Sequence, residues 1–154
     1  AMNVGPGWSA TNGVWEIQSN RASCKTLASA YALVLAEAGA ADVTITGIVQ
    51  RNLSHIGLAF RSADVNNYWV ATVDGLNVLI VKRQAGSASA VITAAFATSL
   101  NTDYVMQVVC SGTTITVFID GVQRAQATSQ TFNQTATKCG LYSERVGNLV
   151  DVAT

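Results

Sequence analysis

The chain has 154 residues, of which 49 % are hydrophobic and 12 % are charged, and its nine basic and nine acidic residues cancel at pH 7. This much apolar material excludes a disordered chain and suffices for one hydrophobic core. The sparse, balanced charges exclude the basic surface that nucleic acids or anionic membranes attract. We therefore expect one domain over residues 1–154, with Ala1 as a cloning remnant, and neither a nucleic-acid nor a membrane partner.

The first half of the chain alternates apolar and polar residues, which is the pattern of half-buried strands. A single proline and 12 glycines also favour strands joined by tight turns. Asp74-Gly75 predicts a hairpin, because Asp-Gly readily adopts the positive φ of a short turn. The strands that we expect here are 13–18, 42–49, 55–60, 68–73 and 77–83.

Segment 27–38 fits two structures. Leu27, Tyr31 and Leu35 lie four residues apart with alanines between them, which is a helical spacing. Gly39 then leads directly into a clear strand at Asp42. We interpret the segment as loop and strand, with a helix as the alternative.

The second half holds the strongest hairpin. Strand 104–110 turns at Ser111-Gly112 into strand 114–119, and closing strands are expected at 139–143 and 148–153. About ten to twelve strands with short turns indicate an antiparallel sandwich or barrel. The nearly uncharged stretch 85–100 suggests a strand buried against another domain or subunit, and hence a homo-oligomer or larger assembly.

Two segments carry a family resemblance. "GLAFRSADVNNYWVATVDG" (57–75) precedes a hairpin, and "TITVFIDG" (114–121) ends in a turn. Together with the order of the other strands, they resemble the concanavalin A-like lectin/glucanase superfamily, and its laminin-G-like branch in particular. The resemblance implies an all-β fold, an antiparallel jelly-roll β-sandwich of two curved sheets. It also implies that the concave sheet can carry sugar and that edge loops can carry calcium or protein contacts.

The sequence shows no recognisable set of catalytic residues. A retaining glycosidase needs two carboxyl groups about 5 Å apart, which alternate residues on one strand can supply. Glu16 and Glu37 have no second carboxylate two residues further on, and the remaining glutamate is Glu144. His55 is the single histidine, and no Gly-x-Ser-x-Gly motif accompanies it. We predict no catalytic residue and a protein that is not an enzyme.

The sequence also gives only weak evidence for a metal site or a disulfide bond. The three cysteines, Cys24, Cys110 and Cys139, match no metal-binding spacing, and we interpret them as buried free thiols. A Cys24–Cys139 bridge is the alternative. Asp64 or Asp120 could ligate calcium, but a calcium site requires several converging oxygens. We therefore predict no metal site and no cofactor, with calcium left unsupported.

The stretch from Arg61 to Trp69 allows two interpretations. Arg61 follows the core residue Phe60, so alternation points it to the other face, and Tyr68 and Trp69 face opposite sides. The stretch is then either the framework of a loop or a sugar site in which an outward aromatic ring is surrounded by polar groups. A second polar cluster lies at 141–148. The candidate ligand-binding residues are Arg61, Asp64, Asn67, Tyr68, Trp69, Tyr142 and Arg145.

These observations favour a non-catalytic module that recognises carbohydrate or a cell-surface glycan. We expect it on a phage virion, in a tail or capsid protein, or on another extracellular surface, although the chain shows no signal peptide. A structural decoration or oligomerisation domain without a small ligand is the alternative. A glycoside-active enzyme is the third hypothesis, and it requires a carboxylate pair that the sequence does not display.

Overall fold

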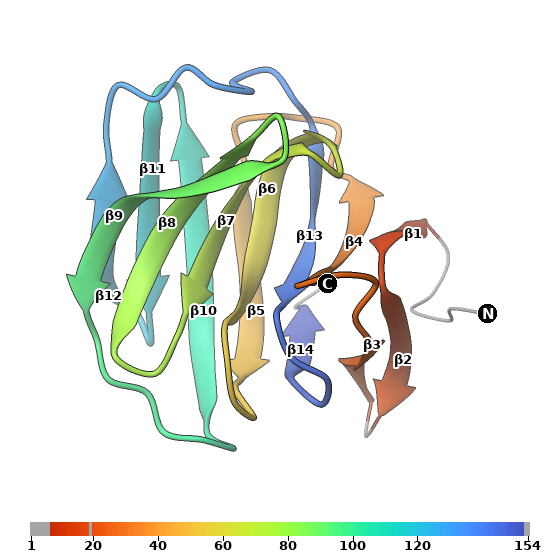
Figure 1. Cartoon of the computed structure of the whole chain (residues 1–154). Coiled ribbons are helices and arrows are strands. Elements are labelled where there is room, and N and C mark those ends of the chain that lie inside the picture. Colours follow the sequence, from red (N-terminus) through yellow and green to blue (C-terminus); the bar gives the residue numbers. More distant parts are fainter. Residues whose placement is uncertain (1–6, 19, 153–154) are drawn as a thin grey trace.

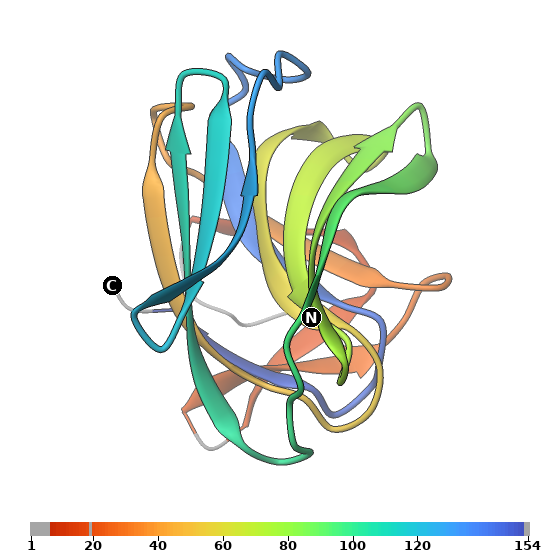
Figure 2. The same ribbon diagram turned by 90° about the vertical axis from the view of Figure 1, so that its left-hand side faces the viewer.

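The computed structural model of the chain describes residues 7–18 and 20–152. Every regular element in these ranges is a β-strand, and the strands form two seven-stranded sheets that face one another (Figure 1). Figure 2 shows the layers from the side, with β5, β10 and β11 in one and β6 to β8 in the other. The predicted all-β antiparallel sandwich is thus confirmed. Within the described ranges, no helix is long and apolar enough to cross a membrane.

Sheet A, as we call the first layer, has β1 and β9 at its two edges, and all its neighbouring strands are antiparallel. Strands far apart in sequence lie side by side in it, because β13 is inserted between β4 and β6. Its strands, in spatial order, are β1 (Trp8–Asn12), β4 (Ala32–Glu37), β13 (Lys138–Ser143), β6 (Ile56–Asp64), β7 (Asn67–Val73), β8 (Asn77–Gln84) and β9 (Ser87–Ala95).

Sheet B, the second layer, has β12 and β2 at its edges and is also antiparallel throughout. Its central hairpin is the one expected at Ser111-Gly112. Its strands, in spatial order, are β12 (Val122–Ala127), β11 (Thr114–Ile119), β10 (Asp103–Ser111), β5 (Thr44–Gln50), β14 (Leu149–Val152), β3 (Arg21–Thr26) and β2 (Val14–Gln18).

The main core lies between the two sheets, where alternate residues of every long strand meet. Sheet A is also apolar on its outer face, which carries a second cluster of buried side chains. An antiparallel sheet that is apolar on both faces is unusual when one face meets solvent. The outer cluster consists of Tyr31, Leu33, Leu35, Ala59, Tyr68, Val70 and Tyr142.

Segment 27–38 forms a loop followed by strand β4, so our interpretation is confirmed and the helical alternative is wrong. Leu33 and Leu35 face outward while Ala32 and Val34 face the core, which is the period of a strand. The uncharged stretch 85–100 contains β9, an exposed edge strand. Its burial against a second subunit stays a prediction.

The three cysteines are free thiols, and each is buried. Burial raises the pKa of Cys24 and Cys139 to about 11 and that of Cys110 to about 12. The interpretation as buried thiols is confirmed, and the alternative of a Cys24–Cys139 bridge is wrong.

Arg61 does not point to the outer face of sheet A, and our expectation from alternation is wrong. The register of β6 against β7 shifts between Phe60 and Asp64, and Arg61 has a φ of +45°. This bulge reverses the direction of the side chain, which is fully buried between the layers. There Arg61 donates to Asp42 Oδ1 at 2.8 Å and to the carbonyl oxygens of Gly112 and Ala41 at 2.7 and 3.2 Å.

Candidate functional site

Three tyrosines pack together on the outer face of sheet A. The ring of Tyr31 stacks on that of Tyr142 with a centroid distance of 5.6 Å, and Tyr68 is tilted against both at 6.1 and 6.2 Å. The guanidinium of Arg83 lies 4.4 Å from the centroid of the Tyr31 ring. We call these four residues the tyrosine cluster. It comes from four segments: the loop before β4, and strands β7, β8 and β13.

The polar atoms of this cluster are only partly used. The hydroxyl of Tyr31 donates to the carbonyl oxygen of Val65 at 3.0 Å, and that of Tyr142 donates to Glu144 Oε1 at 2.7 Å. The hydroxyl of Tyr68 and Nε of Arg83 are buried without a hydrogen-bond partner among the described residues. Burial also raises the pKa of the Tyr68 hydroxyl, so it remains protonated. Unpartnered buried polar groups are uncommon in folded proteins.

A charged group lies beside the cluster at the end of β13. Glu144 Oε2 is 2.8 Å from Nδ1 of His55, and Asp74 Oδ2 is 3.9 Å from the other ring nitrogen. The hydrogen bond to Glu144 raises the pKa of His55, against the opposing effect of burial. Burial opposes ionisation of Glu144, but hydrogen bonds from His55 and Tyr142 outweigh it and lower the pKa of the carboxyl. The pair is therefore readily ionised at mildly acidic pH.

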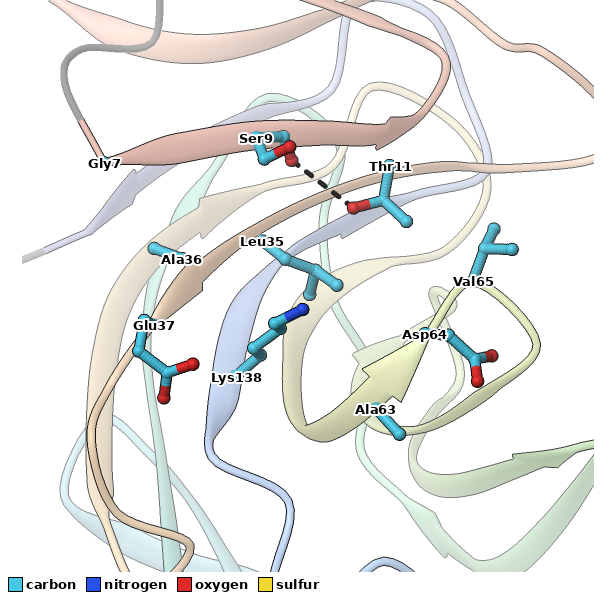
Figure 3. A pocket seen from close by; sticks show the side chains of 10 residues that line it. All are labelled: Gly7, Ser9, Thr11, Leu35, Ala36, Glu37, Ala63, Asp64, Val65 and Lys138. Atoms are coloured by element: carbon cyan, nitrogen blue, oxygen red, sulfur yellow. Dashed lines mark hydrogen bonds between the residues drawn. The ribbon is translucent and has the colours of Figure 1, made fainter.

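An open cleft lies at the other end of β13, over the same face of sheet A (Figure 3). We call it the Lys138 cleft. Its volume is about 510 Å³, which is within the usual range for small-ligand sites. It adjoins the tyrosine cluster, because Val65, which lines the cleft, accepts the hydrogen bond from Tyr31, and Leu35, another lining residue, belongs to the same outer apolar cluster as the tyrosines. Its lining residues are Gly7, Ser9, Thr11, Leu35, Ala36, Glu37, Ala63, Asp64, Val65 and Lys138.

Lys138 is the basic residue of the cleft, and it lies opposite Glu37 in the pairing of β13 with β4. Figure 3 shows its ammonium group directed into the cleft, toward Leu35. No carboxylate in the described part of the chain lies within ion-pair distance of it. A lysine ammonium has three donors, so the group can bond several ligand oxygens at once.

The two carboxylates of the cleft are held by their own loops. Glu37 receives a hydrogen bond from the amide of Gly39 at 3.0 Å, and bonds from the Thr137 side chain and this amide lower the pKa of Glu37. Asp64 accepts from the amide of Asn66 at 2.7 Å and from the side chain of Asn67 at 3.0 and 3.1 Å. Such bonds fix both carboxylates in place, while their remaining lone pairs can accept from a ligand.

The candidate residues predicted from sequence fall in different places. Tyr68 and Tyr142 meet in the tyrosine cluster, and Asp64 lines the cleft. Trp69 is fully buried in the main core, where its indole nitrogen donates to the carbonyl oxygen of Phe132 at 2.8 Å. Arg61 is also interior. Among the candidate residues, the contact between the polar stretches 61–69 and 141–148 is thus the one between Tyr68 and Tyr142.

The two remaining candidates lie apart. Asn67 bonds Asp64 and accepts from the amide of Ala85 at 3.0 Å, and so holds the β6–β7 turn. Arg145 follows β13 at the end opposite the cleft, where it lines a separate hollow of about 490 Å³ with Leu27, Asn52, Leu53 and Val146.

Sequence reasoning missed Lys138, Ser9, Thr11 and Arg83. Alternation assigns Arg83 to the outer face with Tyr68, and their cross-strand pairing was the available signal. The cleft had no comparable signal, because it depends on β1, β4 and β13 being neighbours.

Metal ligands do not converge in the described ranges. No group of three histidine, cysteine, aspartate or glutamate side chains there could hold a metal ion. Asp120, the second calcium candidate, accepts from the amide of Val105 at 2.8 Å and lies in the turn after β11.

Comparisons with known proteins add information about the fold. No family model matches the chain, and no curated protein matches it by sequence. The chain is similar in structure to carbohydrate-binding module CBM66 from Bacillus subtilis, with a TM-score of 0.80 and 19 % identity, over 96 % of this chain and 92 % of the module.

Two further solved structures share the architecture. One is domain 4 of AbnA, an extracellular GH43 arabinanase from Geobacillus stearothermophilus, in complex with arabinotriose: TM-score 0.63, 10 % identity, 94 % of this chain and 79 % of that one. The other is galectin LEC-6 from Caenorhabditis elegans: TM-score 0.57, 13 % identity, 77 % of this chain and 86 % of that one. The fold is therefore a lectin-like β-sandwich, and the laminin-G-like branch stays a prediction.

Proposed function

We propose that this domain is a non-catalytic carbohydrate-binding module and that its sugar lies in the Lys138 cleft, on the outer face of sheet A. The observation that carries the proposal is the cleft itself, an open hollow in which the ammonium group of Lys138 lies beside an apolar floor, outside ion-pair distance of any described carboxylate. The similar structures support it, since they include a carbohydrate-binding module, a galectin and a domain in complex with arabinotriose.

The lining of the cleft suits a neutral sugar. Leu35 offers an apolar surface to the C–H face of a ring, and Ser9 and Thr11 place hydroxyl groups along one wall. Lys138 would donate to ring or hydroxyl oxygens, while Glu37 would accept from hydroxyl groups. Hydrogen bonds to charged groups are stronger than neutral ones and give such shallow sites their orientation.

We also propose that the glycan belongs to a surface, so that the domain works in a virion tail or capsid protein or in another extracellular protein. Three buried free thiols favour the virion protein, which would be made in a reducing compartment, because secreted proteins generally pair their cysteines.

A glycan array tests the proposal, run once with calcium and once with EDTA. Wild-type protein should bind a defined set of glycans in both conditions, and Lys138→Ala should bind the same set at least about tenfold more weakly. Lys25→Ala is the matched control, because Lys25 pairs with Glu16 on sheet B and is exposed. Equal binding by Lys138→Ala would overturn the site, and no binding by the wild type would overturn the function.

A structural role without a small ligand is the second candidate. The observation that favours it is β9, a long exposed edge strand without any charged residue.

A further inference from the structure

The four edge strands of the two sheets differ in how they are protected from pairing. Exposed edges in natural proteins are commonly kept short, bulged or charged, because their free backbone groups attract other strands. In sheet B, β2 carries Glu16 and β12 carries Arg124. In sheet A, β1 has five residues and an irregular register between Ala10 and Asn12. Two of these edges are therefore charged, and the third is both short and irregular.

The fourth edge, β9, lacks charge and proline. It is nine residues long and reads SASAVITAA, and no charged residue occurs anywhere between positions 85 and 100. Residues 87–90 are exposed. Its hydrogen-bonded neighbour is β8, and β12 on the opposite layer pairs with β11 instead. Its register against β8 shifts between Ile80 and Val81, so β9 also carries one bulge, and what it lacks is charge and shortness.

The composition of β9 selects its partner. A charged segment would find no opposite charge on this strand, whereas an identical strand meets it without like-charge contacts. The side chains on residues 87–90 are alternating serine and alanine, small enough to lie against their own copies. The chain as a whole carries no net charge, so two copies do not repel one another at long range.

We propose that β9 pairs antiparallel with β9 of a second copy of this chain. The twofold axis would run perpendicular to the sheet, and the two A sheets would form one continuous sheet. The backbone N–H and C=O groups of β9 that point away from β8 would then form hydrogen bonds with the second copy. This pairing does not depend on sugar binding. It would produce the homo-oligomer that we expect from the uncharged stretch 85–100.

The dimer has a consequence for recognition. A perpendicular twofold axis leaves both outer faces on the same side, and each Lys138 cleft lies on the β4–β13 side of its sheet, away from β9. Nine strand spacings separate the two β13 strands, which places the clefts about 40 Å apart. If the clefts bind sugar, two of them facing one surface would bind repeated glycans with an avidity that one cleft lacks.

Size-exclusion chromatography with light scattering tests the pairing. The wild type should elute at twice the chain mass of 16.1 kDa. Ala90→Lys, an exposed change in the middle of β9, should yield monomer, because it brings two positive charges together near the axis. Gln123→Lys on the edge strand β12 is the matched control and should remain dimeric. A monomeric wild type at the highest attainable concentration would overturn the proposal.

Cross-linking distinguishes strand pairing from any other dimer. Single cysteines at Ala88, Ala90 or Thr93 would be exposed, while the three native thiols are buried. Under mild oxidation, the position nearest the twofold axis should form a covalent dimer, and Gln123→Cys on β12 should not. A dimer in which none of the β9 positions cross-links, or which Ala90→Lys leaves intact, would contradict the proposal. Neither readout requires a sugar, so failure here leaves the proposed function untouched.

Discussion

Two arginines on opposite faces of sheet A show how differently one residue type can be used. Arg61 is fully buried between the layers, where it bonds Asp42 and two carbonyl oxygens. Arg83 lies on the outer face, against the rings of Tyr31 and Tyr68. Its hydrogen bond goes to the carbonyl oxygen of Gly86, and its Nε has no partner among the described residues.

The two guanidinium groups differ in their access to solvent. Arg61 also has one unpartnered nitrogen, Nη1, but no solvent-exposed surface, so no ligand can reach it. Its bonds tie β6 to the segment before β5 and to the β10–β11 turn, and thus join the two sheets at one end. Arg83 is partly exposed and lacks a carboxylate partner in the described ranges. Arg61, on the inner face of sheet A, therefore stabilises the fold, whereas Arg83, on the outer face, is partly exposed to solvent.

The largest effect should come from Arg61→Ala. The change removes a large buried side chain and leaves the carbonyl oxygens of Ala41 and Gly112 without their donor, so we expect a loss of about 2 to 4 kcal/mol in the free energy of unfolding. Urea denaturation measures it. Arg145→Ala, at an exposed position, should change the stability by less than about 0.5 kcal/mol. Equal midpoints for the two variants would contradict the structural role of Arg61.

Trp69 and Tyr68 are neighbours in β7 that face opposite sides of sheet A, so they extend the comparison of the two faces. Trp69→Phe deletes the bond to Phe132 and opens a cavity in the core, and should lower the free energy of unfolding by about 2 kcal/mol. Tyr68→Phe deletes a hydroxyl that has no partner in the described structure, so stability should stay constant or rise by up to about 1 kcal/mol. Thermal denaturation of both variants shows which of the two is less stable. If Tyr68→Phe were the more destabilised, its hydroxyl would have a partner that this account lacks.

Arg83→Met should separate stability from binding. Methionine keeps an apolar stem on Tyr31 but removes the guanidinium, so the stability loss should be about 1 kcal/mol or less. Affinity for a glycan identified on the array should fall by about tenfold if the sugar extends from the cleft over the tyrosine cluster, because a charged donor on that face is lost. Calorimetric titration measures the affinity. An unchanged dissociation constant would restrict the site to the Lys138 cleft alone.

The smallest effect concerns pH. The pKa of His55 is raised by Glu144, so its contribution is present below about pH 6.5 and disappears as pH rises through the folded-state pKa. The pKa of Glu144 is lowered, so its contribution fades as pH falls below about 4.5. The pair should add less than about 1 kcal/mol, mainly between these limits. His55→Gln should remove this maximum from a plot of unfolding free energy against pH, and an unaltered plot would contradict the assignment.

The sequence allowed most of the fold to be predicted wherever side chains alternate strongly. Strands β10 and β11, whose apolar residues face one way, were recognisable at once. Strands β1, β3 and β12 were not, because segments such as RASCKT and VQRAQA hold few apolar residues. Their strand structure depends on neighbours in the sheet rather than on local pattern.

The candidate site was less predictable for two physical reasons. The positive φ of Arg61, unfavourable for a residue with a Cβ, is maintained by long-range bonds, and local alternation contains no sign of it. The cleft joins Leu35 to Lys138, two residues about a hundred positions apart, because β13 lies between β4 and β6. Tyr68 and Tyr142 were found because their residue types alone mark them as candidates.

The most direct measurement is a two-dimensional ¹⁵N–¹H spectrum titrated with the strongest-binding oligosaccharide from the array. We predict chemical-shift changes concentrated at Ser9, Leu35, Lys138 and neighbouring residues of the outer face, with sheet B and the Arg145 hollow unchanged. Changes confined to that hollow or to β9, or no change with any oligosaccharide tested, would contradict the claim that the outer face of sheet A binds sugar.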